Sequence, residues 1–363
     1  MSLKTTPIEP PRNALVISYG GIGDILLTTP LIASLKKAYP RTVLDAYVQP
    51  GREGILQGNP DVSNVYTARA PHGAKSYREF IRDFRGRYDL AVAARVSDRQ
   101  VIFAWTAGRK AISMIGPEGR RCLWMKALLS GWTSLDTTRH VVHNILDLAD
   151  VLGIEKQYEC VAPRDPDSPA RISELLPFDR HTRAYAVVHP YPRNPYKQWT
   201  REGWRTLVEF LVGRNLQVVI TGGSDEAERE YLDSLVDSIS GPVLNVAGRI
   251  NLADASELLT HAGLYVGPDT AITHLASVLG VPTLGLFGQI LPHYVPYHSS
   301  LHSHPIIESA PGTIRTGNVV VVTGDCDCPQ GVLRCAQAVD EVGACMKNLQ
   351  PESVLNVVES ILE

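Results

Sequence analysis

The stretch from Leu264 to Gln289 constrains the fold more than any other part of the chain. Its two short apolar runs, Leu264–Val266 and Thr283–Phe287, predict buried strands of a parallel sheet. Between them, Pro268-Asp269-Thr270 opens a helical segment that ends near Gly280. The amino end of such a helix points out of the carboxyl edge of the sheet, where its free backbone N–H groups suit a phosphate. An ordinary crossover, in which one of these polar residues is a simple helix cap, is the alternative.

Both halves of the chain repeat this alternation of strands and helices. The first half has predicted strands at Ala14–Ser18, Val43–Val48 and Asp89–Ala94, and the second half begins with Tyr185–His189 and Val218–Thr221. Such alternation predicts doubly wound parallel sheets, and 363 residues favour two domains. We therefore expect an α/β protein with two Rossmann-like domains.

Proline content suggests where the domains divide. Residues 161–183 hold four prolines and predict an interdomain linker, which leaves a first domain at 1–160 and a second at 184–348. Residues 349–363 contain a final amphipathic helix.

Composition excludes several classes of protein. The net charge of −3 argues against a globally basic nucleic-acid-binding protein, and we expect no nucleic acid as a partner. No apolar run reaches the roughly 18–20 residues of a membrane span, and the polar, proline-rich start does not resemble a signal peptide. These features predict a cytoplasmic protein.

Polar residues follow several predicted strands of the second half. Lys197 lies in the loop after Tyr185–His189, Glu226 follows Val218–Thr221, and His274 lies in the helix that Thr270 opens. Each has an ordinary alternative: a solvated lysine, an acid that stabilises a helix dipole, and a packed helix residue. Together they meet at one sheet edge, where ligands bind in open α/β sheets. They are also the residue types that a nucleoside diphosphate requires.

A glycine-rich loop follows the first strand. Gly20-Gly21-Ile22-Gly23-Asp24 lacks the third glycine of a dinucleotide fingerprint, because Leu26 occupies that place. The glycines favour close approach of another molecule to the backbone. For Asp24, a helix cap is the plain alternative to a role in chemistry.

The first half also contains a local excess of basic residues. From residue 95 to 126, seven basic residues stand against two acidic ones, and the basic residues are Arg95, Arg99, Arg109, Lys110, Arg120, Arg121 and Lys126. Such an excess suits an anionic acceptor or membrane headgroups, and a solvated surface is the alternative.

Four cysteines lie close together near the end of the chain. Cys326, Cys328, Cys335 and Cys345 fall within twenty residues and make a candidate site for structural zinc or iron. The first spacing, Cys-x-Cys, is tighter than usual for zinc, and buried reduced thiols are the alternative.

These motifs together resemble glycosyltransferase family 9, the bacterial heptosyltransferase family, over nearly the whole chain. The matching elements are Gly23-Asp24, Leu27-Thr28-Thr29-Pro30, Lys197-Gln198-Trp199, Glu226, Asp269-Thr270-Ala271-Ile272-Thr273-His274 and Phe287-Gly288. Ala271 replaces the family's usual glycine, and Gln289-Ile290-Leu291-Pro292 departs from its usual Pro-Thr-Asp-Pro.

The resemblance implies a GT-B fold, in which two Rossmann-like domains face a central cleft, with the acceptor on the first domain and the donor on the second. It implies that the terminal helix at 349–363 crosses back onto the first domain. It also implies an inverting transferase that moves heptose from ADP-heptose to a glycan or glycolipid acceptor such as lipopolysaccharide core. No cofactor is required, and contact with the inner membrane would be peripheral. A nucleotide-sugar isomerase on the same scaffold and a non-catalytic nucleotide-sugar-binding protein are the alternatives.

The resemblance also assigns roles to residues. Asp24 and Lys197 would be catalytic, with Asp24 as the general base. The donor-binding residues would be Gly23, Glu226, Asp269, Thr270, Ala271 and His274. Arg95, Arg120 and Arg121 are the candidates for acceptor binding.

Overall fold

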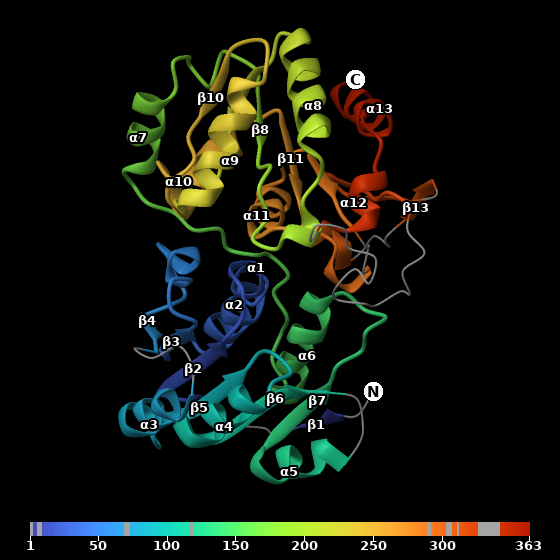
Figure 1. Ribbon diagram of the computed structural model, residues 1–363. Helices are drawn as coiled ribbons and strands as arrows, with labels where there is room; N and C mark the ends of the chain where they lie inside the picture. Colours follow the sequence, from blue (N-terminus) through green and yellow to red (C-terminus); the bar gives the residue numbers. More distant parts are fainter. Residues whose placement is uncertain are drawn as a thin grey trace. The chain divides into compact units, whose positions relative to one another are not determined.

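Parallel strands dominate both halves of the computed structural model. It describes residues 3–5, 9–68, 73–116, 120–288, 292–302, 307–310, 312–325 and 342–363. The chain divides into two compact units, Met1–Pro163 and Arg164–Glu363 (Figure 1). Each unit is built around one sheet.

The first unit contains a seven-stranded sheet in the order β1-β7-β6-β5-β2-β3-β4. Its strands are β1 (Leu3–Lys4), β2 (Asn13–Ser18), β3 (Val43–Val48), β4 (Asn64–Thr67), β5 (Tyr88–Ala93), β6 (Gly108–Ile115) and β7 (Gly131–Ser134). All pairs are parallel except β1 with β7. Its helices are α1 (Ile22–Leu26), α2 (Thr29–Ala38), η1 (Glu53–Leu56), α3 (Gly73–Phe84), α4 (Asp98–Ala107), α5 (Arg120–Leu128) and α6 (Val141–Leu152).

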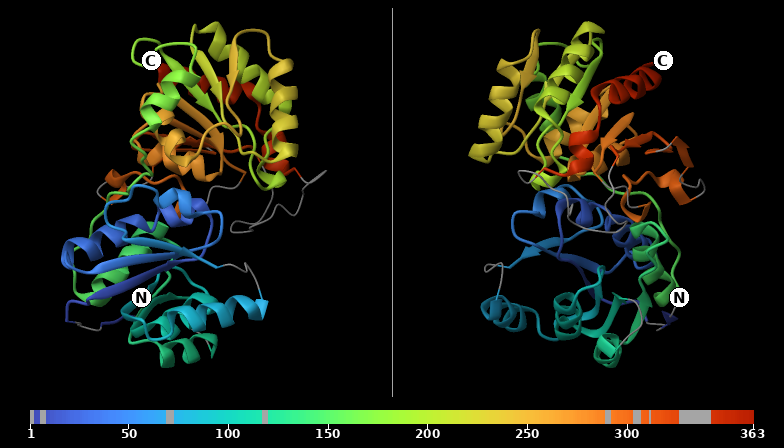
Figure 2. Two further views of the ribbon diagram at one scale, coloured as in Figure 1. Left: turned by 90° about the vertical axis from the view of Figure 1, so that its left-hand side faces the viewer. Right: turned by 45° about the vertical axis from the view of Figure 1, so that its right-hand side comes forward.

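Helices cover both faces of this first sheet. Figures 1 and 2 show α3, α4 and α5 together on one face, with α2 and α6 on the other. Under α3 and α4, aromatic rings fill the core: Phe80 stacks on Phe103 with ring centroids 4.0 Å apart, and Tyr47 meets Phe80 edge-on at 4.8 Å. Burial of these large rings stabilises the packing of α3 and α4 on this face of the sheet.

The second unit contains an eight-stranded sheet in the order β10-β9-β8-β11-β12-β15-β14-β13. Its strands are β8 (Tyr185–Val188), β9 (Gln217–Ile220), β10 (Val243–Asn245), β11 (Leu264–Pro268), β12 (Thr283–Leu286), β13 (Ile307–Ala310), β14 (Thr313–Thr316) and β15 (Val319–Val322). In this spatial order, the strands β10, β9, β8, β11, β12 and β15 run parallel. Beyond β15, β14 pairs antiparallel with β15, and β13 pairs antiparallel with β14. Its helices are α7 (Ser168–Leu175), η2 (Pro195–Lys197), α8 (Arg201–Gly213), α9 (Glu226–Asp237), α10 (Leu252–Thr260), α11 (Ala271–Val278), η3 (Pro292–Tyr294), η4 (Ser299–His302), α12 (Ala344–Asn348) and α13 (Pro351–Leu362).

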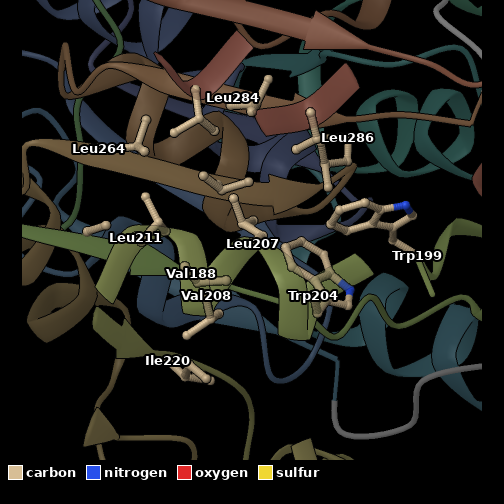
Figure 3. Close-up of a cluster of buried hydrophobic side chains, with 14 of the residues drawn as sticks. Val188, Trp199, Trp204, Leu207, Val208, Leu211, Ile220, Leu264, Leu284 and Leu286 are labelled. Atoms are coloured by element: carbon tan, nitrogen blue, oxygen red, sulfur yellow. The ribbon is translucent and has the colours of Figure 1, made fainter. Parts of the chain in front are cut away.

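Two tryptophans anchor the core of the second unit. Figure 3 shows Trp199 and Trp204 next to each other beside aliphatic side chains from α8 and the sheet. Their ring centroids are 5.1 Å apart in an edge-to-face arrangement, and both rings are buried. The indole Nε1 of Trp199 donates to the backbone oxygen of Leu349 at 2.9 Å. The loop that carries Lys197 is therefore tied to the core two residues later.

The segment from Ile22 to Ala38 forms two helices in the structure. α1 ends at Leu26, and α2 begins at Thr29 with Pro30 in its first turn. The Thr29 hydroxyl donates to the backbone oxygen of Leu26 at 2.7 Å, which satisfies a carbonyl group at the break.

Two other expectations about the second half need correction. The segment 161–183 is not only a linker, because it contains α7, where Ser168 and Arg171 bind the buried Asp254 of α10. The helix at 349–363 was expected on the first domain. Instead, Val354 and Val358 of α13 are buried in the core of the second unit, beside α8. Each segment contacts residues that are distant in the sequence: α7 makes polar contacts with α10, and α13 makes apolar contacts with the core of the second unit.

Among the residues that the structure describes, no helix has the length and apolarity needed to cross a bilayer.

The packing of Trp199 generates a stability prediction. A Cβ added at Gly203 would lie 2.5 Å from the Trp199 ring, whereas one added at Gly213, in the last turn of the same helix, would meet nothing within 4 Å. Gly203→Ala should therefore destabilise the protein by about 1–3 kcal/mol, from forced movement of a buried ring. Gly213→Ala should be neutral or stabilising by up to about 1 kcal/mol, because alanine favours a helix. Thermal unfolding of both variants tests this, and equal midpoints would contradict it.

Candidate functional site

The predicted donor-site residues other than Gly23, which lies in the first unit, follow strands of the second sheet at its carboxyl edge. Val188 of β8 pairs with Val266 of β11, and Pro268 pairs with Leu286 of β12. The loops that follow these strands therefore begin side by side. In parallel α/β sheets this edge is where ligands bind.

Lys197 is held at this edge by its neighbours. It closes the short helix η2, and its backbone N–H donates to the backbone oxygen of Asn194 at 3.0 Å. The Gln198 amide donates to the backbone oxygen of Pro190 at 3.4 Å, and Trp199 is buried in the core. Only the charged end of the lysine can therefore change its position without disturbing the core.

Lys197 forms an ion pair with Asp269. Its Nζ lies 2.5 Å from Oδ2 of the carboxylate and 3.4 Å from the backbone oxygen of the same residue. The two side chains are 24% and 35% exposed, so the pair remains open to a ligand. A ligand with negative charge would compete with the carboxylate for this ammonium group.

The amino end of α11 begins directly after this aspartate. Thr270 is the N-cap residue but makes no side-chain cap bond within the described structure, and Ala271 is the first helical residue. Instead, the hydroxyls of Thr270 and Thr273 lie 3.2 Å apart, and that of Thr273 donates to the backbone oxygen of Pro268 at 2.5 Å. The backbone N–H groups at the helix start therefore stay available to an anion.

His274 lies one turn into α11 beneath this charged pair. It is buried, and its Nδ1 atom has no hydrogen-bond partner within the described residues. Burial lowers the pKa of His274, the Asp269 carboxylate raises it, and the Lys197 charge lowers it further. The imidazole is therefore neutral near pH 7, with one ring nitrogen that lacks a partner.

The first turn of α9, which follows β9, holds two glutamates in different environments. Glu226, the predicted ribose ligand, is exposed in the first turn of α9, which Asp225 caps through the Ala227 N–H at 3.1 Å. Glu228 is half-buried and accepts from the Gly223 N–H at 2.6 Å. Burial raises the pKa of Glu228. The sequence alone does not single out Glu228, because only its contact with the Gly223 N–H distinguishes it from Glu226.

A histidine at the end of β8 was also missed. His189 is buried, and its Nδ1 atom lies 3.0 Å from the Thr221 hydroxyl at the end of β9. Burial lowers the pKa of His189 to about 4. The only signal in the sequence was a polar residue at the end of an apolar strand.

In the first unit, Asp24 occupies the corresponding edge. It lies in α1, after β2, and its Oδ2 accepts from the Gly21 N–H at 2.8 Å. A Cβ on Gly20 would come within 2.7 Å of the same oxygen, so the loop needs glycine there. Gly23 lies within α1, one residue before Asp24. Asp24 therefore helps to cap the start of α1, as the alternative interpretation predicted.

Asp24 is also ion-paired with Arg95. The Arg95 guanidinium, just after β5, contacts Oδ1 of the carboxylate, and both side chains are about one-quarter exposed, at 26% and 23%. The structure thus brings the predicted base and one predicted acceptor residue together. Arg120 and Arg121 begin α5, but their side chains lie outside the described part of the structure.

An arginine held by two tyrosines lies in the same unit. The Arg99 guanidinium is 5.2 Å from the ring centroid of Tyr19 and 5.3 Å from that of Tyr77. Tyr19 follows β2 directly, and its backbone oxygen accepts from the Gln100 amide at 3.4 Å. Arg99 was counted only as part of the basic excess, because its aromatic partners are far away in the sequence.

Most of the predicted cysteine site lies outside the described residues. This applies to Cys326, Cys328 and Cys335. Cys345 lies in α12 and is buried. Across the part of the chain that the structure describes, no group of three potential metal-ligating side chains occurs. The metal site therefore stays a prediction.

The environment of His189 predicts a pH dependence of stability. Its pKa is about 4 in the folded protein and about 6.5 in an unfolded chain, so below pH 6.5 the unfolded chain binds the proton more readily. As the pH falls from about 6.5 to about 4, this residue should lower the free energy of unfolding by about 1.4 kcal/mol per pH unit. Thermal unfolding should show that stability falls more between about pH 7.5 and about pH 5 in wild type than in His189→Gln. Equal losses would show that His189 does not carry this effect.

Comparison with known proteins agrees with this arrangement. The family model described as glycosyltransferase family 9 (heptosyltransferase) matches residues 77–310, more than half of the chain's 363 residues. Lipopolysaccharide heptosyltransferase 3 of Escherichia coli is 28% identical over 281 residues, which cover 73% of this chain and 80% of that protein.

Solved structures of the same family share the fold. The glycosyl transferase family 9 protein of Veillonella parvula has a TM-score of 0.74 at 16% identity and covers 97% of both chains. The E. coli heptosyltransferase WaaC with ADP has a TM-score of 0.69 at 18% identity, covering 96% of this chain and 99% of that one. The predicted fold class, an α/β protein of the GT-B type with two Rossmann-like domains, is confirmed. So is the predicted class of enzyme, because the chain is a glycosyltransferase that belongs to family 9, the heptosyltransferase family.

Proposed function

We propose that this chain is an inverting heptosyltransferase that moves heptose from ADP-heptose to a glycan of the lipopolysaccharide core. One observation carries the proposal: Lys197, its partner Asp269 and the amino end of α11 lie together at the carboxyl edge of the second sheet. The names of the relatives support the choice of sugar and acceptor, and the ADP in the WaaC structure supports the choice of nucleotide.

In the proposed donor site, the diphosphate replaces Asp269 as the partner of Lys197. The lysine then faces a phosphate, and the backbone N–H groups at Thr270 and Ala271 face the other phosphate. His274, neutral because it is buried, lies close enough to Asp269 and Lys197 to feel both of their charges. These groups stabilise the negative charge that develops on the leaving diphosphate, and the mechanism needs no metal ion.

The ribose would be bound at the loop after β9. Glu226 is exposed there and carries two acceptor oxygens for a pair of ribose hydroxyls. Glu228 braces the loop through the Gly223 N–H. In this proposal Glu226 contacts the donor, and Glu228 positions the glycine loop.

The acceptor reacts at Asp24. The hydroxyl oxygen of the acceptor forms a bond to the anomeric carbon of the heptose, while the bond from that carbon to the phosphate oxygen breaks. The electron pair leaves with the diphosphate, and the hydroxyl proton passes to Asp24. Arg95 and the Gly21 N–H hold the carboxylate in one orientation for this step. If bond breaking runs ahead of attack, an ionised carboxylate also stabilises the positive charge on the sugar.

The place of the reaction follows from its substrates. ADP-heptose and a lipid-linked core acceptor would meet at the cytoplasmic face of the inner membrane, with peripheral contact by the basic first unit. The excess of positive charge between residues 95 and 126 supports contact with anionic headgroups or with an anionic acceptor.

Transfer from a radiolabelled donor tests the proposal. The enzyme is incubated with ADP-heptose labelled in the sugar and with truncated core acceptors, and the label should move to the acceptor. An altered sugar still linked to the nucleotide would identify an isomerase instead. A bound, unchanged donor would identify a binding protein. Label transferred from UDP- or GDP-sugars but not from ADP-heptose would overturn the choice of donor.

Asp24→Asn separates catalysis from helix capping. Asparagine caps a helix about as well as aspartate, so the fold and the affinity for ADP should persist. Turnover should fall by about 10²–10⁴-fold, because the general base is lost. Asp98→Asn, which alters another aspartate in the first turn of a helix of the same unit, is the matched control and should keep most activity. If the Asp24→Asn enzyme kept more than about a tenth of wild-type turnover at saturating substrates, Asp24 would have only its structural role.

A further inference from the structure

The amino edge of the first sheet lies at the opposite end of the strands from Asp24. Strand register brings its segments together: Asn13 of β2 pairs with Val43 of β3, Ala14 pairs with Leu90 of β5, and Tyr88 pairs with Gly108 of β6. The Val43 N–H also donates to the backbone oxygen of Arg12 at 3.0 Å. Residues 12–13, 41–43, 85–89 and 108–110 therefore form one surface, here named the amino-edge surface.

This surface is strongly basic. Its exposed basic residues are Arg12, Arg41, Arg85, Arg87, Arg109 and Lys110, and Asp89 is its acidic residue. Asp89 lies 3.6 Å from Arg12 and 3.7 Å from Arg109 and so offsets part of their charge. Just before this surface, near the end of α3, Asp83 is bound to Arg82. The surface keeps a positive excess in a chain whose net charge is −3.

Apolar side chains are exposed beside these charges. Trp105, near the end of α4, is 53% exposed, and Val43 is 48% exposed. The Gly86 N–H donates to the backbone oxygen of Thr106 at 2.9 Å, so the loop with Arg85 and Arg87 adjoins the tryptophan. A large ring left in water amid arginines is typical of residues that sit at a membrane–water interface.

Ordinary helix chemistry explains only part of this arrangement. α3 ends at Phe84 and α4 at Ala107, so Arg85 and Arg109 follow helix ends, where basic residues are favourable. Arg41 likewise lies three residues after the end of α2, but Arg12 precedes β2, and a helix end does not account for it. Nor does a helix end account for an exposed Trp105.

We propose that the amino-edge surface docks onto a bilayer rich in anionic lipid, with Trp105 entering the headgroup region. The arginines and Lys110 supply the charge complementarity, and the ring supplies apolar contact. This deepens the proposed peripheral contact by assigning it a surface. Asp24 lies at the other end of β2, at the carboxyl edge, and is not part of this surface.

Binding of the full chain to vesicles tests the proposal. Wild type should sediment with vesicles of phosphatidylcholine that contain phosphatidylglycerol and not with phosphatidylcholine alone, and added salt should release it. The double variant Arg41→Glu/Arg85→Glu should lower the partition coefficient at least about tenfold. Trp105→Ser should lower it at least about threefold. The matched double variant Arg164→Glu/Arg183→Glu, which reverses exposed charges of the second unit, should bind as wild type does.

The outcomes separate this surface from the reaction. Arg41→Glu/Arg85→Glu should keep wild-type turnover on a water-soluble acceptor, so lost vesicle binding with intact turnover supports the proposal. The proposal would be overturned if wild type did not bind anionic vesicles. It would also be overturned if both double variants lost vesicle binding equally. Binding to a soluble polyanion such as heparin without binding to vesicles would also overturn it and would point to an anionic glycan.

Discussion

The ion pair between Lys197 and Asp269 is the interaction on which the proposed chemistry depends. The lysine lies two residues before Trp199, a buried ring that binds the backbone of Leu349, and the aspartate directly follows β11. Two elements far apart in the sequence are thereby joined at one point of the sheet edge. In the proposed site, this half-buried pair holds the ammonium group in place until a phosphate replaces the carboxylate.

The two units use the same position of a parallel sheet for different tasks. In the second, a helix start and a lysine suit a diphosphate. In the first, Asp24 follows β2 and is held by Arg95 and the Gly21 N–H, an arrangement that suits a base for an acceptor hydroxyl. The opposite edge of the first sheet has no part in this chemistry, which leaves its arginines for a different partner. The two proposals therefore assign the two charged regions of the first unit to opposite edges of its sheet.

The sequence predicted what depends on local patterns. The apolar runs of β11 and β12 and the polar opening of α11 follow from periodicity and capping, and the structure contains them with small shifts of their ends. Features that depend on distant partners were missed or misread. Glu228 differs from Glu226 only through the Gly223 N–H, and Arg95 meets Asp24 across 71 positions of the sequence. Likewise, α13 buries Val354 against the second unit because α8 offers it an apolar face, which no local pattern reveals.

The affinity of the enzyme for adenosine, AMP and ADP tests the central claim most directly. Isothermal titration compares wild type with Lys197→Met, which keeps most of the side chain and removes its charge. If Lys197 exchanges Asp269 for a phosphate, the variant should bind ADP about 10–100-fold more weakly, since a charged hydrogen bond contributes about 1.5–3 kcal/mol. Adenosine binding should not change. Equal losses for all three ligands would mean that the substitution only disturbs the fold, and undiminished ADP affinity would remove Lys197 from the site.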